Sequence, residues 1–152
     1  MCGWRTPKKG GQAAQALGRS RGGFSTKLHV LVDALGNPLK FILTSGAAGD
    51  NPQAIPLLTG LQTGEVLADR GYDADATLAY ITDQLHAQAT IPPKKNRVEP
   101  RDCDYVAYKE RHLVECFIGK LKYFRRVCSR FDKYGSRFLA FVHFASMVIW
   151  LK

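Results

Sequence analysis

The stretch F-S-T-K-L-H-V-L-V-D-A-L-G-N-P-L-K-F-I-L-T, residues 24–44, determines how the first half of the chain folds. Apolar residues recur at every second position over 24–32, which is the pattern of a strand with one buried face. A turn at 33–38, containing Asp, Gly, Asn and Pro, leads to a second apolar run at 39–44. The sequence therefore predicts a β-hairpin, and we expect His29 to be an ordinary strand residue.

Downstream of the hairpin, short helical and strand-like runs alternate. Strands are expected at 65–68 and 87–91, and helices at 52–61, from 73 or 75 to 85, at about 104–126 and at about 136–151. A hairpin followed by such alternation predicts an α/β fold, in which helices pack on a mixed sheet. Residues 1–23 lack apolar periodicity, so we expect an irregular basic leader there and one domain over 24–152.

The charge of the chain indicates a polyanionic partner. The 152 residues include 22 Lys and Arg and 13 Asp and Glu, which gives a formal net charge of +9. Residues 1–32 and 94–137 are basic, whereas residues 33–93 hold seven acids and two basic residues. Basic flanks around an acidic centre suit a protein that binds phosphates at its edges and cations at its centre. The simpler interpretation is that charge varies along a soluble chain.

Cysteine spacing and apolar segments exclude several classes. The four cysteines, at 2, 103, 116 and 128, form no C-x-x-C pair, which argues against zinc-ribbon and thioredoxin-type proteins. The most apolar segment, 138–151, is shorter than the roughly 20 residues that span a bilayer. Since no signal peptide is visible either, we expect a cytoplasmic protein that does not bind a membrane.

The helix expected at about 104–126 has one face with a distinctive set of polar side chains. At about 100° per residue, Tyr108, Arg111, Glu115 and Lys122 fall within about 60° of one another. This face places an acid between two cations and a tyrosine, although intrahelical ion pairs on a solvated face are the simpler interpretation. Apolar side chains roughly opposite are expected to pack on the core: Val114, Phe117, Leu121, Phe124 and Cys128.

Asp69 is the second candidate functional residue. It follows the strand expected at 65–68, within the sequence L-A-D-R-G-Y-D at 67–73. A carboxylate at the carboxyl end of a strand, followed at once by a glycine turn, is a common way to direct an acid into a cleft. Asp is also an ordinary turn residue, so this position alone is weak evidence.

These motifs resemble those of the DDE insertion-sequence transposases. The sequence around Asp69 is similar to the motif at the second catalytic Asp of that family, and Tyr108, Arg111, Glu115 and Lys122 match the pattern Y-x2-R-x3-E-x6-K of the insertion-sequence four superfamily. Further segments look like the insertion-sequence five group within it: G-R-S-R-G-G-F-S-T-K at 18–27, V-D-A-L-G-N-P at 32–38, Y-K-E-R-H at 108–112 and F-L-A-F-V-H at 138–143.

The resemblance implies an RNase H-like catalytic domain that cleaves and transfers DNA strands at the ends of the element. Three carboxylates of such a domain bind two divalent metal ions, normally Mg²⁺, and Asp69 and Glu115 would be two of these catalytic ligands. Arg111 and Lys122 would hold phosphates of the transposon end, and Tyr108 would contact the same DNA. Hard oxygen ligands suit Mg²⁺, and two such ions stabilise both oxygens of a phosphoryl transfer.

A basic loop adds a further candidate contact with DNA. Lys94, Lys95 and Arg97 follow the strand expected at 87–91, and such a run is solvated charge by default. In a family that binds DNA, contact with phosphates becomes the favoured interpretation. The expected partner is therefore DNA, both the transposon ends and the target. A second copy of the chain, in a homodimer, is a further possible partner.

The sequence departs from the resemblance at the first Asp of the triad. That residue belongs on a strand upstream of the hairpin, where no acid precedes Asp33, and neither Asp33 nor Asp50 matches the missing position. The expected fold is accordingly an RNase H-like mixed sheet with flanking helices that lacks the first, central strand. Either an upstream-frame segment supplies that strand and its Asp, or the chain is a truncated remnant that binds DNA without cutting it and regulates an intact transposase.

Overall fold

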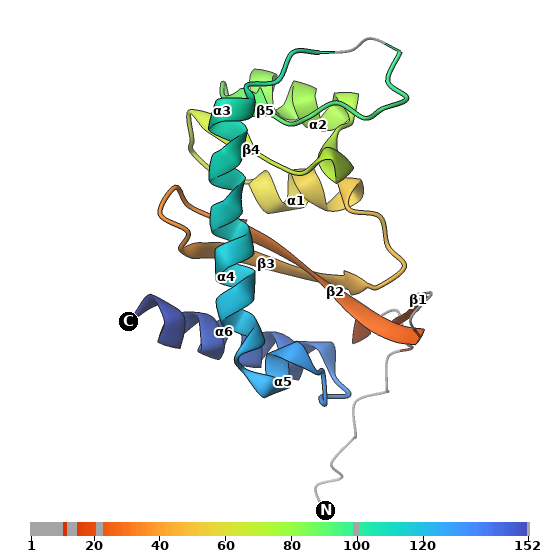
Figure 1. Cartoon of the computed structure of the whole chain (residues 1–152). Helices are drawn as coiled ribbons and strands as arrows, with labels where there is room; N and C mark the ends of the chain where they lie inside the picture. The colour runs from red at the N-terminus through yellow and green to blue at the C-terminus, as the bar shows by residue number, and fades with distance from the viewer. Residues whose placement is uncertain (1–10, 12–14, 21–22, 99–100, 152) are drawn as a thin grey trace, which may run out of the picture.

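The computed structural model describes residues 11, 15–20, 23–98 and 101–151, and Figure 1 shows their arrangement. The strands are β1 (Gly18–Ser20), β2 (Gly23–Val32), β3 (Pro38–Ser45), β4 (Glu65–Leu67) and β5 (Gln88–Thr90). The α-helices are α1 (Ala54–Leu58), α2 (Asp75–Ala79), α3 (Tyr105–Tyr108), α4 (His112–Lys122), α5 (Arg125–Cys128) and α6 (Gly135–Trp150). Short 3₁₀ turns are η2 (Asn51–Gln53), η3 (Arg70–Tyr72) and η5 (Lys109–Arg111), and η4 (Tyr80–Gln84) is a π-helical turn. Strands and helices mix along the chain, which confirms the predicted α/β class.

β2 and β3 form the predicted antiparallel hairpin, which pairs from Thr26 to Val32 on the β2 side. Asp33 shapes the turn, since its Oδ1 accepts hydrogen bonds from the backbone amides of Leu35 and Asn37, both at 2.8 Å. A carboxylate that accepts amides two and four residues ahead replaces part of the backbone pairing that ends at the turn. Local turn chemistry and apolar alternation therefore agree at this hairpin.

β1 lies within the stretch predicted as an irregular leader, so that prediction is corrected at these three residues. β1 pairs antiparallel with the start of β2, with Arg19 opposite Phe24. Three residues are too few to show the alternation that marks a strand, which explains why the sequence did not reveal it. Residues 1–10, 12–14 and 21–22 of the predicted leader lie outside the described residues.

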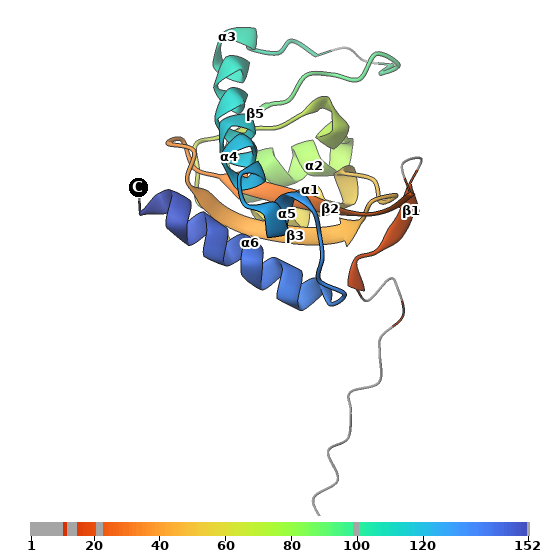
Figure 2. The same cartoon turned by 60° about the horizontal axis from the view of Figure 1, so that its bottom comes forward.

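Helices cover both faces of the hairpin. On one face, α4 and α6 contribute the buried residues Phe117, Leu121 and Ala145, which pack against Leu28 and Val30 of β2. α1 lies on the other face, in contact with both strands. Figure 2 shows α6 running along the hairpin with α4 crossing it. The alternating side chains of β2 thus enter two different layers, whereas the period-two pattern predicted only one buried face. The second face is covered by α1, through a tertiary contact that alternation does not show.

A second, smaller sheet carries the downstream half of the fold. β4 and β5 pair in parallel, with Val66 opposite Ala89. Val66 packs in a buried cluster with Leu58 of α1, Ile81 of η4 and Ile91, just beyond β5. A parallel pair joined through helical turns is a βαβ arrangement, in keeping with the predicted alternation of strands and helices.

The predicted single mixed sheet is not observed among the described residues. Both parallel and antiparallel pairs occur, but β1-β2-β3 and β4-β5 are separate sheets. A cavity bordered by residues 27–32 and 66–69 separates the edge of β2 from β4. Because the two strands do not reach each other across this space, their backbones cannot pair.

The predicted helices are observed with different ends and with one break. Asp104 caps α3, since its Oδ1 accepts the amides of Val106 and Ala107 at 2.8 and 3.1 Å. The helix expected over 104–126 continues through η5 and α4, and is interrupted where Phe124 takes an extended conformation with φ −85° and ψ 102°. The partly buried Phe124 packs on the Phe117 cluster, a tertiary contact that helical periodicity does not show.

The remaining helices differ mainly at their ends. The helix expected at 52–61 begins as η2 around Pro52 and is α-helical only over α1. The helix expected up to 85 starts at Asp75 and finishes as η4, while the last one closely matches α6. No helix in the described part of the chain is both long and apolar enough to cross a membrane.

The core around α4 yields a first prediction. Phe117 is only 2% exposed and packs against both the hairpin and α6. We expect Phe117→Ala to lower the free energy of unfolding by about 3–5 kcal/mol, because it removes buried apolar surface and leaves a cavity. Phe144→Ala, at an exposed position of α6, serves as the control and should change stability by about 0.5 kcal/mol or less. Urea denaturation of both variants makes the measurement, and equal losses would contradict the assignment of the core.

Candidate functional site

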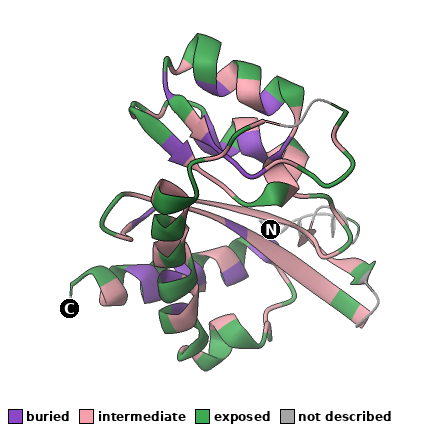
Figure 3. Ribbon diagram, turned by 45° about the horizontal axis from the view of Figure 1, so that its top comes forward, coloured by how far each residue is buried: buried purple, intermediate pink, exposed green. Residues whose placement is uncertain are grey.

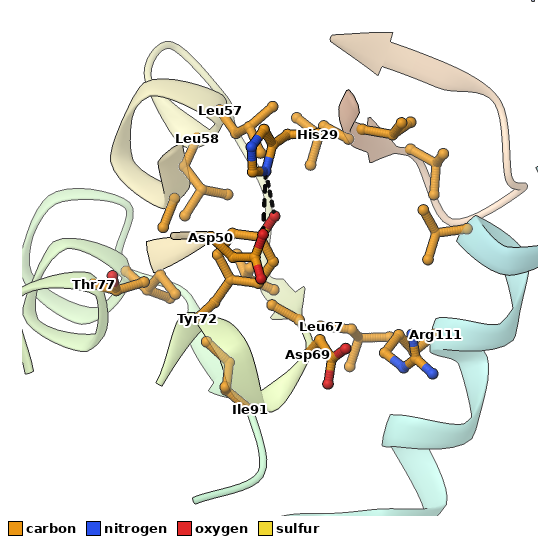
Figure 4. Close-up of a pocket in the computed structure, with 18 of the residues that line it drawn as sticks. His29, Asp50, Leu57, Leu58, Leu67, Asp69, Tyr72, Thr77, Ile91 and Arg111 are labelled. Carbon is orange, nitrogen blue, oxygen red and sulfur yellow. Dashed lines mark hydrogen bonds and ion pairs between the residues drawn. The ribbon is translucent and has the colours of Figure 1, made fainter. Parts of the chain in front are cut away.

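The cavity between the two sheets has a volume of about 270 Å³. Residues 27–32 of β2 border it on one side, and residues 66–69 border it on the other. Leu57 of α1 and Arg111 of η5 lie on its remaining walls, as Figure 4 shows. The walls are mostly apolar. Asp69 and Arg111 lie where β4 ends, and Lys27 and His29 of β2 form a second polar group with Asp50.

Asp69 stands at the end of β4, as the sequence predicted. It precedes η3, and its Oδ1 accepts a hydrogen bond of 2.7 Å from the backbone amide of Arg70. The side chain caps this turn and remains exposed on the cavity rim. In Figure 4 its carboxylate lies on the side of the cavity where Arg111 enters. An exposed acid held at a strand end can bind a cation or a hydrogen-bond donor from solvent.

Three members of the Y-x2-R-x3-E-x6-K pattern lie together. Arg111 donates a hydrogen bond of 2.6 Å from Nη2 to Oε1 of Glu115, and its Cζ lies 5.5 Å from the centre of the Tyr108 ring. Burial lowers the pKa of Arg111, but the hydrogen bond to Glu115 and nearby negative charge, including that of Asp69, outweigh this and raise that pKa. Arg111 is therefore a permanent cation between the two acids.

Lys122 and Glu115 lie outside the wall of the cavity. The side of α4 that borders the cavity is formed by Val114 and Ile118, whereas Glu115 points outward with a side chain 60% exposed. Lys122 lies at the last position of α4, exposed and without an ion pair to any described residue. Glu115 thus reaches the Asp69 end of the cavity through Arg111 rather than by lining it.

The described residues form no group of three or more Asp, Glu, His or Cys side chains that could hold a metal ion. Asp50 also borders the cavity, but its Oδ1 accepts a hydrogen bond of 3.0 Å from Nζ of Lys27. That lysine additionally donates to the carbonyl of Ala48 at 2.8 Å. Asp50 therefore anchors the loop before η2, and the carboxylates present at the cavity do not by themselves fit a two-ion centre.

A buried histidine holds the turn after Asp69. His29 is 2% exposed, and its Nδ1 is hydrogen-bonded to the Tyr72 hydroxyl at 3.0 Å and its Nε2 to the Thr44 hydroxyl at 2.8 Å. Burial lowers the pKa of His29, although Asp50 at 3.9 Å opposes this. Burial, followed by the charges of Asp50 and Asp69, raises the pKa of Tyr72 to about 12. Both groups are therefore neutral at pH 7 and fix η3 against the hairpin.

The sequence did not predict this role of His29. An isolated histidine in a strand is usually an ordinary part of the strand. The hydrogen-bond partners of His29 lie 15 and 43 positions away, so the local sequence does not reveal them. One available signal was the alternation itself, which places His29 on the opposite face of the strand from Leu28 and Val30. Only the fold brings Tyr72 to that face.

The basic loop at 94–97 divides into two kinds of residue. Asp73, buried, accepts hydrogen bonds from the Lys94 amide at 2.7 Å and from guanidinium groups of Arg97 and Arg101 at 2.8 Å each. Burial alone would raise the pKa of Asp73, but these donors and charges outweigh it and hold that pKa below its usual range. Arg97 also pairs with Asp75, so its guanidinium group is engaged within the protein. Its contact with DNA stays a prediction.

Lys94 and Lys95 are the exposed residues of the same loop. Neither ammonium group forms an ion pair with a described residue. The backbone of Lys94 is fixed by Asp73, whereas the side chains extend from the loop. This arrangement presents two solvated cations on a loop whose base is held by buried ion pairs.

Taken together, these features define an α/β domain with an acidic strand end beside an arginine–glutamate pair. Residues 3–149 match the family described as "Transposase DDE domain". The chain therefore belongs to the transposase DDE domain family. Domains of this family generally use divalent metal ions and act on DNA.

The chain is also similar to a Brucella ovis protein named "Putative transposase for insertion sequence element IS6501". The two are 46% identical over 129 residues, which cover 84% of this chain and 99% of the relative. No solved structure matches the chain. The family match and this relative confirm the prediction of an insertion-sequence transposase.

The His29–Tyr72 hydrogen bond yields a prediction on pH. Because the folded-state pKa of His29 lies below about 6.5, the ordinary value, its contribution to stability is fully present above that pH and is lost as the pH falls through the folded-state pKa. We expect the free energy of unfolding to decrease from about pH 7 to about pH 5, and His29→Gln to reduce this decrease. His143→Gln, an exposed histidine of α6, is the control. Urea titrations at both pH values give the free energy of unfolding. If that free energy decreases equally as the pH falls in the wild type and in His29→Gln, this role of His29 is contradicted.

Proposed function

We propose that this chain carries part of the catalytic centre of a DDE transposase, which cleaves and transfers DNA strands at the ends of an insertion sequence. The observation that supports it is the meeting of Asp69, at the end of β4, with the Arg111–Glu115 pair of the neighbouring helix. Both acids belong to motifs that this family uses for catalysis. In the proposal, Asp69 and Glu115 are two of three carboxylate ligands.

The proposed ion is Mg²⁺, which prefers carboxylate oxygens and retains several waters. When bound, such ions stabilise the attacking and leaving oxygens of phosphoryl transfer. Two carboxylates leave this centre incomplete, because the described residues offer no third metal-binding side chain that would form a group with them. The chain's own contribution is to position Asp69 through η3 and to keep Glu115 beside a permanent cation.

We propose that an upstream strand supplies the third carboxylate. The cavity has the free edge of β2 on one side and β4 on the other, so one inserted strand would join β1-β2-β3 and β4-β5 into a single mixed sheet. Strands in a sheet lie about 4.8 Å apart, so a strand paired with both would bring its side chains beside Asp69. The completed sheet would be RNase H-like, with the inserted strand at its centre.

The proposed DNA contacts lie on the same helix and on the basic loop. Arg111, exchanging its bond with Glu115 for a phosphate, and the unpaired Lys122 would hold the transposon end. Tyr108 lies beside Arg111 and would contact the same strand. The segments at 18–27 and 138–143 support placing the chain in the insertion-sequence five group.

A second candidate function is that of a DNA-binding regulator of an intact transposase. The observation that favours it is the absence of a third acid at the Asp69 end of the described cavity. Exposed cations act on phosphates without any catalytic geometry, so such a chain retains affinity for DNA. Cleavage assays separate the two functions.

Salt dependence tests the proposed phosphate contacts. We expect Arg111→Ala and Lys122→Ala each to weaken binding to duplex DNA and to reduce the slope of log K against log salt by about 0.9, the value for one phosphate contact. Lys122→Arg, which keeps the charge, is the matched control and should retain the slope. Fluorescence anisotropy at several salt concentrations makes the measurement. A salt slope that is unchanged in both alanine variants would show that Arg111 and Lys122 do not contact phosphates. The Arg111–Glu115 contact would then be an ordinary intrahelical ion pair.

Cleavage tests the completeness of the centre. We expect the chain alone to bind DNA that contains the element ends but not to cut it, because the two carboxylates do not form a full metal site. Fusion of the upstream segment in frame should restore cleavage that needs Mg²⁺ and is abolished by Glu115→Gln. A strand-nicking assay compares the two proteins. Specific cutting by the chain alone, lost in Glu115→Gln, would show that Asp33, Asp50 or another acid replaces the missing ligand.

A further inference from the structure

The segment after α4 carries a concentration of positive charge that the proposed catalytic centre does not use. Residues 123–137 contain five Lys and Arg and a single acid, Asp132. Asp132 borders the groove described below, and its Oδ2 is buried without a hydrogen-bond partner among the described residues. Arg125 and Lys133 are exposed and form no ion pair with any described residue, so their charge is available to a ligand.

A groove of about 440 Å³ lies beside these cations. Phe24 of β2, Phe131 and Lys133 border it, and both phenylalanines are more than 60% exposed. Cζ of Arg125, on α5, lies 5.8 Å from the centre of the Phe131 ring. Two exposed aromatic rings bordering one groove beside unpaired cations are a combination that suits a binding site.

The floor of the groove is rigid. Arg130 donates hydrogen bonds to the Thr26 hydroxyl and, at 2.9 and 3.2 Å, to the carbonyls of Asp132 and Lys133. Its guanidinium group also lies 5.4 Å from the centre of the Phe138 ring. These contacts fix the backbone of the turn that presents Phe131 and Lys133, so the turn itself loses little freedom on binding.

We propose that this groove binds single-stranded DNA. Bases of a single strand stack on exposed aromatic rings while cations follow the phosphates, and this combination distinguishes single-strand sites from duplex sites, whose bases are already stacked. Phe131 and Phe24 supply the rings, and Lys133 and Arg125 supply the charges. Figure 3 shows that the short helix after α4 is largely exposed. Phe131 and Lys133 are exposed as well, so a strand can reach them from solvent.

The position of the groove suits a strand that leaves the catalytic centre, a role that rests on the proposed function. Glu115 and Lys122 are seven positions apart on α4, about 10 Å along a helix that rises 1.5 Å per residue, and α5 begins at Arg125 directly after the break at Phe124. α5 follows the end of α4 in Figure 1. An unpaired strand produced by cleavage at an element end would therefore pass along α4 to the groove.

Binding of a labelled oligo-dT strand and of a duplex, measured by fluorescence anisotropy with the full chain, tests the proposal. We expect Phe131→Leu, which keeps apolar bulk without a flat π face, to weaken binding of the single strand by about fivefold or more and to change duplex binding by less than about twofold. Phe131→Trp should retain the affinity. Lys133→Gln should reduce the single-strand salt slope by about 0.7.

Two control variants lie outside the groove. Tyr123→Leu removes an aromatic residue that is 90% exposed, and Arg137→Gln removes a charge that stacks on Tyr134. Both should leave single-strand affinity within about twofold. Equal losses for Tyr123→Leu and Phe131→Leu, or a loss of duplex binding as large as that of the single strand, would overturn the proposal. Since this assay needs neither metal nor cleavage, a groove that binds single strands normally, together with a fusion to the upstream segment that does not cut, would refute only the proposed function.

Discussion

The hydrogen bond between His29 and Tyr72 is the direct polar link between the hairpin and the turn that carries Asp69. β2 and β4 are not hydrogen-bonded neighbours among the described residues, so side chains must hold the two sheets in position. Packing of Leu31 against the Leu58 cluster supplies non-directional attraction. The orientation of η3 needs a directional contact, and a buried imidazole with both nitrogens bonded provides it.

The sequence predicted those parts of the structure that depend on local pattern. Period-two alternation gave the hairpin, and the strand-end position gave Asp69 its place at the cavity. Helical spacing brought Arg111 and Glu115 into contact. The break at Phe124 was not predictable, because the periodicity continues through it and only packing on the Phe117 cluster ends the helix.

Charge was the least predictable property, because its meaning depends on tertiary partners. Arg97 and Lys95 stand two positions apart in one basic loop, yet Arg97 neutralises the buried Asp73 while Lys95 faces solvent. Arg130 is likewise committed to backbone carbonyls, in contrast to Arg125. Net charge therefore overstates the surface available to phosphates, and only the cations without internal partners contribute to binding of DNA.

The separation of the two sheets has a consequence for how activity depends on folding. In the proposed function, one strand both fills the apolar cavity and delivers the third carboxylate beside Asp69. Pairing with β2 and β4 would stabilise the inserted strand only when both edges are correctly placed, which in turn requires the His29–Tyr72 contact. The acid cannot then reach the centre in a partly folded protein. Completion of the sheet and completion of the catalytic site would be a single event, so that the unpaired chain retains its cations for DNA and acquires cutting activity only on assembly.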